Sequence, residues 1–333
     1  MVKDLLSVRH LNVGFDHQFG HTAVIDDVSF SIEKGETLCI VGESGCGKSL
    51  TSLSIMGLLP KGGRITDGKI LFQDHDISHK TTKELSKIRG KEISMIFQEP
   101  MTALNPLHTV GHQIAEVLLA HEKVSRNEAN QKAVEMLKLV GIPSPEKRFK
   151  QYPHELSGGM RQRVMIAMAL ICKPDLLIAD EPTTALDVTI QAQILELIQE
   201  LKNKFGMSLL LITHDLGVVS ETADKVIVMY AGQVVESSET KELFTHPKHP
   251  YTQGLIKSIP KMDEDEEELA TIKGTVPSPD EMPEGCRFVT RCPFAKDICH
   301  QKKPPIVNVG HEVHCWLYSD DNVKGGIPLV DNV

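Results

Sequence analysis

One octapeptide carries the clearest chemical signal in this sequence. GESGCGKS fits the pattern G-x-x-x-x-G-K-[ST], with the apolar run LCIV before it and a helical pattern after it, as this pattern requires. Glycines let backbone N–H groups approach phosphate oxygens, Lys48 supplies a positive charge, and Ser49 offers a hydroxyl to Mg²⁺. The thiol of Cys46 is expected to fill space rather than to react. The predicted site for nucleotide phosphates consists of Gly42, Glu43, Ser44, Gly45, Cys46, Gly47, Lys48 and Ser49.

Two adjacent acids follow a second apolar run. Asp180 ends the run LLIAD, and Glu181 comes directly after it. Open α/β sheets bind their ligands at the carboxyl ends of the strands, so this place favours a functional acid pair over a merely solvated one. Asp180 is predicted to hold Mg²⁺, and Glu181 is predicted to orient or deprotonate an attacking water.

A second glycine-containing segment, LSGGM, precedes the helical pattern RQRVMIAMALI. Ser157, Gly158 and Gly159 would stand at a helix N-terminus, where backbone N–H groups can bind an anion. A single nucleotide cannot easily use both this segment and the octapeptide if they lie on different parts of the fold. The sequence therefore predicts a head-to-tail pair of chains, each offering LSGGM to the phosphates that the other chain holds. The alternative is a tight turn and helix cap without a ligand.

Four of the seven cysteines lie near the end of the chain, at Cys286, Cys292, Cys299 and Cys315. Charged residues interrupt the N-terminal segment and leave no apolar region for an export signal, so a reducing cytosol is expected and a disulfide framework is not. The spacing C-x5-C-x6-C-x15-C lacks the close pairs of structural zinc sites and suits a cubane iron–sulfur cluster at least as well. Zinc and four unliganded thiols are the alternatives.

These candidate residues need a scaffold, and the hydrophobic pattern predicts one in which strands alternate with helices. Such alternation indicates a parallel sheet covered on both faces. This α/β part is expected to end near Lys248, followed by an acidic run at residues 263–268, interpreted as a solvated linker, and by a Pro-, Gly- and Cys-rich tail. The longest apolar runs, such as Val164 to Cys172, are too short to cross a membrane. A formal net charge of -9 argues against nucleic acid as the main partner.

Several motifs agree in order and spacing with one known family. GESGCGKS, LSGGM followed by RQR, LLIADEPTTALD and LLITHD resemble the ATP-binding subunits of ATP-binding cassette (ABC) transporters, over about the first 250 residues. The resemblance implies a P-loop NTPase with a RecA-like parallel-sheet core, a β subdomain and a helical signature subdomain. The ABC nucleotide-binding domain would cover residues 1–248, with its helical subdomain at about 100–165, and a small Cys-rich extension would cover 249–333.

The resemblance also implies roles for individual residues. Phe15 would be the aromatic that stacks on adenine, and Gln98 the Q-loop glutamine that links Mg²⁺ and the attacking water to the membrane subunits. Glu181 would be the catalytic base, Asp187 the D-loop aspartate, and His214 the histidine that contacts the γ-phosphate. Taken singly, the phenylalanine would be read as a core residue, the glutamine as a loop residue and the histidine as a structural one. Their shared spacing with the other motifs favours the functional interpretation.

A narrower resemblance covers nearly the whole chain. SIMGLLP, SMIFQEPMTALNP, YPHELSGGMRQR, HPKHPYTQGL and the cysteine-bearing tail are similar to the D-type ATPases of the dipeptide and oligopeptide permease family, which includes nickel importers. This implies a heterodimer with an F-type ATPase, two membrane permeases, an extracytoplasmic binding protein, a place at the cytoplasmic face of the membrane and a [4Fe-4S] cluster in the tail. Two positions depart from the family pattern: Met160 replaces the usual glutamine and Thr184 the usual serine.

The expected function is therefore Mg²⁺-dependent ATP hydrolysis that drives the import of dipeptides or oligopeptides. Import of nickel or another small solute is the alternative within the same family. A soluble ABC ATPase without a membrane partner is a further alternative, but those proteins usually carry two cassettes or long inserted arms. This chain has one cassette, no such insertion and a net negative charge.

Overall fold

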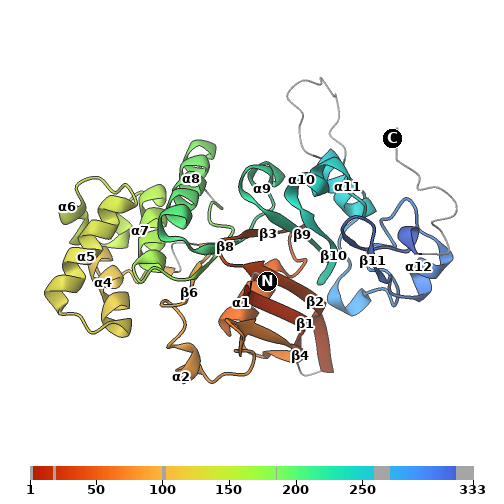
Figure 1. Ribbon diagram of the computed structural model, residues 1–333, viewed down its shortest axis with the longest axis horizontal. Coiled ribbons are helices and arrows are strands. Elements are labelled where there is room, and N and C mark those ends of the chain that lie inside the picture. The colour runs from red at the N-terminus through yellow and green to blue at the C-terminus, as the bar shows by residue number, and fades with distance from the viewer. Residues whose placement is uncertain (1–2, 18–19, 100–102, 185, 259–270, 320–333) are drawn as a thin grey trace.

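The computed structural model describes residues 3–17, 20–99, 103–184, 186–258 and 271–319, which form two sheets and a group of helices at one end (Figure 1). The smaller sheet is antiparallel and has the strand order β2-β1-β4-β5. Its long strands carry alternating exposed and buried side chains, so one face packs on the core and the other meets solvent. The strands are β1 (Asp4–His17), β2 (Gly20–Glu33), β4 (Gly63–Phe72) and β5 (His75–Asp76).

The larger sheet has the strand order β11-β12-β10-β9-β3-β8-β7-β6. The predicted parallel pairing is confirmed from β9 to β6, where each neighbouring pair is parallel. From β9 to β11 the pairing is antiparallel. For β9 and β10 this follows from the two-residue turn that joins them, which cannot serve a parallel pair. The strands are β3 (Thr37–Val41), β6 (Ile93–Ile96), β7 (Leu176–Asp180), β8 (Ser208–Ile212), β9 (Lys225–Tyr230), β10 (Gln233–Glu239), β11 (Ile306–Asn308) and β12 (Glu312–His314).

Helices follow the parallel strands and also form a separate group. Figure 1 shows α4, α5, α6 and α7 together at the end of the molecule opposite the C-terminal strands. The predicted helix start at Ser125 is confirmed, since its hydroxyl accepts the backbone N–H of Glu128 at 3.2 Å. The helices are α1 (Lys48–Met56), α2 (Thr82–Leu85), α4 (Val110–His121), α5 (Arg126–Leu139), α6 (Pro145–Phe149), α7 (Gly158–Leu170), α8 (Val188–Phe205), α9 (Leu216–Thr222), α10 (Thr240–Thr245), α11 (Pro250–Lys257) and α12 (Asp297–Gln301), with short 3-10 turns at Pro153–Glu155, Pro279–Glu281 and Trp316–Tyr318.

The two faces of the larger sheet belong to two different hydrophobic cores. Strand β7 shows this best, because Leu177 and Ala179 pack in the core that includes the helical group, whereas Leu176 and Ile178 pack in the core shared with the smaller sheet. All five residues of β7 are buried. Burial on both faces holds the carboxyl end of this strand, and the acids that follow it, in a fixed position.

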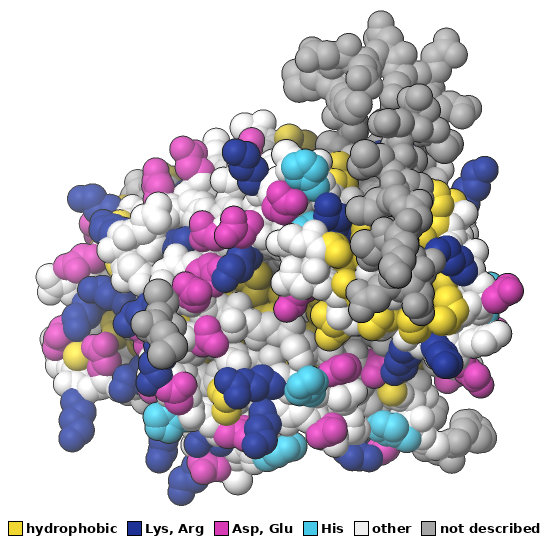
Figure 2. All heavy atoms as spheres, turned by 45° about the vertical axis from the view of Figure 1, so that its right-hand side comes forward, with side chains coloured by type: hydrophobic (Ala, Val, Ile, Leu, Met, Phe, Trp, Pro, Cys, Tyr) yellow, Lys and Arg dark blue, Asp and Glu magenta, His cyan; other side chains and the backbone are white. Residues whose placement is uncertain are grey.

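Beyond residue 248 the chain packs back onto the larger sheet, which β12 extends by pairing with β10. Tyr251 and Phe288 are buried in the larger core, so this segment shares a core with the ATPase motifs. Figure 2 shows hydrophobic side chains gathered on the face that carries this segment, while acidic and basic side chains alternate over the rest of the view. The predicted acidic linker at 263–268 lies outside the described residues. Within the described ranges, none of the helices has both the length and the apolar character needed to cross a membrane.

Candidate nucleotide-binding site

The predicted phosphate loop lies between the end of β3 and the start of α1, as the sequence pattern requires. All three of its glycines have positive backbone angles, φ 153° at Gly42, φ 80° at Gly45 and φ 102° at Gly47. A Cβ atom at Gly42 would lie 2.2 Å from the backbone oxygen of Met229 in β9, so only glycine fits. The tight loop aims the N-terminus of α1, with its unpaired N–H groups and positive dipole, toward the space above the sheet.

Lys48 is buried, with 5% of its surface exposed. Its ammonium group donates to the backbone oxygens of Gly42 at 2.8 Å and of Glu43 at 3.1 Å. The loop therefore folds around the charge of this lysine. Ser44 and Gly45, at the tip of the loop, are exposed and open to a ligand.

Of the three residues predicted to contact Mg²⁺, Ser49 and Asp180 are brought together, whereas Gln98 bonds to Glu181. The hydroxyl of Ser49 donates to Oδ1 of Asp180 at 3.0 Å, and the hydroxyl of Ser52 donates to Oδ2 at 3.5 Å. Burial raises the pKa of Asp180, although the bond from Ser49 opposes this. Hydroxyl and carboxylate oxygens are the ligands Mg²⁺ prefers, so this donor set fits the ion. Sequence reasoning missed Ser52, which lies one helical turn after the loop in α1.

Glu181 is the centre of a second polar cluster. The amide of Gln98 donates to Oε2 at 3.0 Å, the hydroxyl of Thr184 donates to the same oxygen at 3.0 Å, and Nδ1 of His214 lies 3.6 Å from Oε1. The backbone of Glu181 has φ 45°, an uncommon conformation for a residue that is not glycine. Three of these four residues were predicted. Thr184 was noted only as a departure from the family pattern, yet it contacts the carboxylate directly.

The other predicted ligand residues lie on α7, before α8 and on β1. Ser157 caps α7 and accepts the N–H of Met160 at 3.4 Å, and no hydrogen bond joins residues 157–159 to the loop in the described part of the chain. Gly158 is exposed, and Gly159 lies near Ile190 of α8. Asp187 is exposed at the N-terminus of α8, and the half-buried Phe15 lies opposite Gly63 in the smaller sheet.

The four tail cysteines are free thiols. Burial raises the pKa of Cys315 to about 12, and the neighbouring thiols of Cys286, Cys292 and Cys299 add to the shift. Four thiols are the donor set of a [4Fe-4S] cluster, so the residue types fit. Yet no three His, Cys, Asp or Glu side chains form a metal-binding group among the described residues. The predicted metal site is thus not seen: Cys286 and Cys292 pack against the large core, whereas Cys315 belongs to a separate small cluster.

Comparisons with known proteins agree with this geometry. Residues 25–184 match the family described as "ABC transporter", and residues 235–299 match "Oligopeptide/dipeptide transporter, C-terminal region". The post-hydrolysis dimer of the ATP-binding cassette MJ0796, bound to ADP and Pi, is similar with a TM-score of 0.64 and 27% identity, covering 71% of this chain and 98% of that one. CbiO1 of Clostridium perfringens, part of the ABC transporter complex cbiONQ, has a TM-score of 0.63 and 30% identity, covering 73% and 92%.

Two curated relatives match almost end to end. The oligopeptide transport ATP-binding protein AppD of Bacillus subtilis is 56% identical over 323 residues, which cover 96% of this chain and 98% of that protein. The dipeptide transport ATP-binding protein DppD of Escherichia coli is 49% identical over 319 residues, covering 95% and 98%. The chain has the ABC ATPase fold, and it belongs to the ATP-binding subunits of the dipeptide and oligopeptide permease family of ABC transporters.

Proposed function

We propose that this chain is the ATP-hydrolysing subunit of a membrane importer for dipeptides or oligopeptides. The observation that carries the proposal is the convergence of Gln98, Thr184 and His214 on the Glu181 carboxylate, next to the Asp180–Ser49 pair. The relatives whose names specify oligopeptide or dipeptide transport supply the substrate class. Residues 1–248 would form the nucleotide-binding domain and residues 249–333 the extension.

Each residue of the site would have one task. Lys48 and the loop N–H groups would bind the phosphates, Phe15 would stack on adenine, and Ser49 and Asp180 would hold Mg²⁺, with Gln98 next to them. Bound Mg²⁺ neutralises phosphate charge. Glu181 would orient and deprotonate the attacking water, and Gln98 and Thr184 hold its Oε2 oxygen.

The phosphate-binding segment at residues 157–159 would complete a site on a second ATPase subunit. It starts a helix in the helical group, and no hydrogen bond ties it to the phosphate loop of its own chain in the described ranges. Asp187 is exposed beside it and would meet the same partner. A head-to-tail heterodimer with an F-type ATPase would use the anion-binding N–H groups of both chains. ATP binding would close this pair and hydrolysis would open it.

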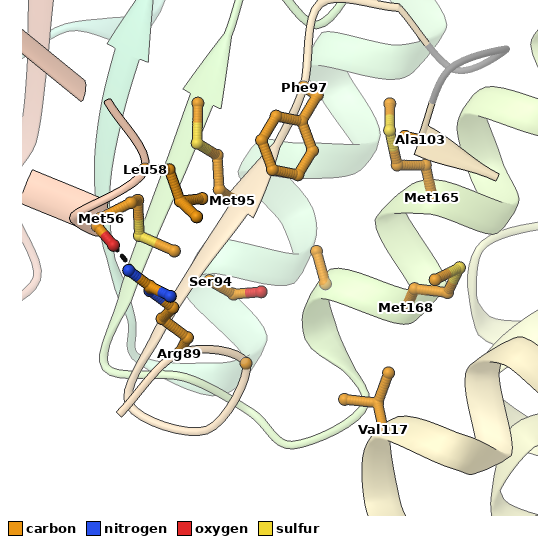
Figure 3. Close-up of a pocket in the computed structure, with 12 residues that line it drawn as sticks. Met56, Leu58, Arg89, Ser94, Met95, Phe97, Ala103, Val117, Met165 and Met168 are labelled. Carbon is orange, nitrogen blue, oxygen red and sulfur yellow. Dashed lines mark hydrogen bonds between the residues drawn. The ribbon is translucent and has the colours of Figure 1, made fainter. Parts of the chain in front are cut away.

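A groove beside Gln98 is the proposed contact with a permease. The groove has a volume of about 240 Å³ and lies between β6 and α7 (Figure 3). Phe97 exposes 37% of its surface and Leu58 38%, and the facing wall includes Met165 and Met168. An apolar segment of a permease, presented at the cytoplasmic face of the membrane, would fill this groove. Since Phe97 precedes Gln98, movement of that segment would reach the catalytic cluster.

The tail cysteines would bind a [4Fe-4S] cluster, with zinc as the alternative metal. The support is that Cys292 and Cys299 lie near enough to raise the pKa of Cys286, and that all three raise the pKa of Cys315. Anaerobically purified protein would then be brown, and Cys292→Ser would weaken its broad absorbance. A colourless protein with one equivalent of zinc would contradict the cluster.

Reconstitution tests the proposed function. The chain is purified with its membrane partners and placed in proteoliposomes with the extracytoplasmic binding protein, and ATP hydrolysis and uptake are measured with dipeptides, longer peptides and Ni²⁺. We expect peptide-stimulated hydrolysis coupled to uptake. Stimulation by Ni²⁺ alone would favour the nickel alternative, and purification with no membrane partner would favour a non-transport ATPase.

A further inference from the structure

The phosphate loop is held by residues outside the ATPase motifs. Glu43, its second residue, donates its backbone N–H to the hydroxyl of Tyr251 at 2.8 Å. The carboxylate of Glu43 accepts two hydrogen bonds from the guanidinium group of Arg291, at 2.7 and 3.0 Å. Tyr251 belongs to α11, and Arg291 directly precedes Cys292, so both contacts come from the segment beyond residue 248.

Several contacts hold the Arg291 side chain in place. It is 4% exposed, and it also donates to the backbone oxygens of Lys273 at 3.0 Å and Ile272 at 3.2 Å. Its guanidinium group lies 5.6 Å from the ring centroid of Tyr230. A planar fork with two parallel bonds to one carboxylate has a geometry that a lysine cannot reproduce. The ion pair with Glu43 is therefore directional and largely shielded from solvent.

Tyr251 is positioned by an aromatic cluster. It is fully buried, its ring centroid lies 4.7 Å from that of Tyr230 in an edge contact, and it lies 5.4 Å from that of Phe288. Tyr230 ends β9 and Phe288 lies between the first two tail cysteines. The hydroxyl that binds Glu43 is thus held by rings from both the large sheet and the tail.

A second arginine links the tail to another point of the loop. Arg287 donates to the backbone oxygen of Ala231 and to Oδ2 of Asp26, the latter at 2.7 Å. The next residue of that turn, Gly232, donates its N–H to the backbone oxygen of Cys46 at 2.9 Å. The tail therefore reaches the phosphate loop directly at its second residue and indirectly, through the β9–β10 turn, at its fifth.

The contacts on Glu43 lead on to the residue that binds phosphate. The backbone oxygen of Glu43 accepts a hydrogen bond from the ammonium group of Lys48 at 3.1 Å. We propose that Arg291 and Tyr251 are positioning residues of the nucleotide site, which fix Glu43 and thereby hold the loop and Lys48 in the arrangement that binds ATP. This inference rests on the proposed ATPase function and makes the tail a part of the nucleotide site.

The test separates nucleotide binding from turnover in the full chain assembled with its partners. The Kd for a fluorescent ATP analogue, and kcat and KM for ATP, are measured for Arg291→Ala, Arg291→Lys and Tyr251→Phe. We expect Arg291→Ala to raise Kd and KM about tenfold with kcat within about twofold, because the loop loses a buried charged contact but the catalytic cluster is untouched. Arg291→Lys restores part of the affinity, and Tyr251→Phe raises KM about threefold.

Two further variants sharpen the test. Arg148→Ala is the matched control, since this half-buried arginine of α6 bonds Gln151 far from the loop, and its KM stays at the wild-type value. Adding Glu43→Gln to Arg291→Ala causes no further loss, because the two side chains act as one pair.

Several results would contradict the inference. Wild-type KM and Kd in Arg291→Ala, or a lower Tm with unchanged KM, would overturn the inference. If Arg291→Ala does not fold, Tyr251→Phe decides, since it removes one hydroxyl, and a wild-type KM there overturns the inference too. A wild-type complex that hydrolyses no ATP would instead overturn the proposed function itself.

Discussion

The polar cluster around Glu181 and the tail both depend on polar side chains, but they expose them differently. In the cluster around Glu181, His214 exposes 69% of its side chain and Gln98 is exposed. Where the tail meets the larger sheet, Arg291 exposes 4% of its side chain, and the buried pair of His311 in the tail and Glu236 in β10 exposes 5% and 0%. The histidine and the amide next to Glu181 are open to solvent, whereas the charged groups that hold the tail against the sheet are removed from water. The first kind should govern turnover and the second kind stability and position.

The largest effect is expected from a substitution of Glu181, on the rate of ATP hydrolysis. Glu181→Gln should lower ATP hydrolysis at least about a hundredfold, because an amide cannot act as a general base. ATP binding should be retained, since the shape of the side chain and its bonds to Gln98 and Thr184 can persist. Single-turnover hydrolysis and Kd in the assembled complex measure the two separately. A variant with normal turnover would remove Glu181 from the role of base.

The buried pair of His311 and Glu236, which joins the tail to β10, should affect stability instead. His311 Nε2 lies 2.6 Å from Oε1 of Glu236, which also accepts the backbone N–H of Lys248 at 2.6 Å. His311→Ala leaves the carboxylate buried without its partner and should lower the free energy of unfolding by about 3 kcal/mol. Urea denaturation measures this, and limited proteolysis shows whether the tail separates first. The exposed His300 of α12 supplies the control, and equal losses in both alanine variants would argue against the buried pair.

A pH dependence should arise from the segment that joins the two regions. Burial lowers the pKa of His249 to about 4, from an ordinary value of 6.5. The unfolded chain therefore binds the proton more readily, so the stabilising contribution is complete above pH 6.5 and is lost as the pH falls toward 4. When the pH falls from 7 to 5, protonation of this histidine in the unfolded chain should lower the free energy of unfolding by about 2 kcal/mol.

Denaturation of the wild type and of His249→Asn at both pH values measures this contribution. Nδ1 of His249 accepts the N–H of Tyr251 at 3.1 Å at the start of α11. Asparagine can serve the same cap but does not titrate, so the variant should lose less stability on acidification. An identical pH dependence in both proteins would show that other groups dominate.

The smallest predicted effect concerns a single neutral contact of the tail. The hydroxyl of Tyr318 donates to the backbone oxygen of Lys248 at 2.9 Å. Tyr318→Phe should cost about 1 kcal/mol, because one hydrogen bond is lost while the ring still packs. The shift in urea midpoint measures it, with ATP hydrolysis expected at the wild-type rate. A change in kcat without a change in stability would contradict the division between the two regions.

The sequence predicted those parts of the protein that a short motif or a local hydrophobic pattern identifies. The phosphate loop, the strand that ends in Asp180 and the cap of α5 at Ser125 all depend on neighbours within a few residues, so a motif or a period identifies them. The antiparallel half of the larger sheet was not predicted, because strand pairing depends on partners far along the chain. Hydrophobic pattern also could not show that β12 would join β10, since β12 is a short strand in a Pro- and Cys-rich tail.

By itself, the sequence determined the candidate residues for the chemistry, because phosphate binding and general base catalysis need particular side chains at fixed spacing. Only the tertiary structure decided which residues support them. Arg291 and Glu43 are 248 positions apart, and Tyr251 and Glu43 are 208 positions apart. A bond between distant residues leaves no periodic trace, since the core packing of both segments, and not their spacing, brings the two atoms together.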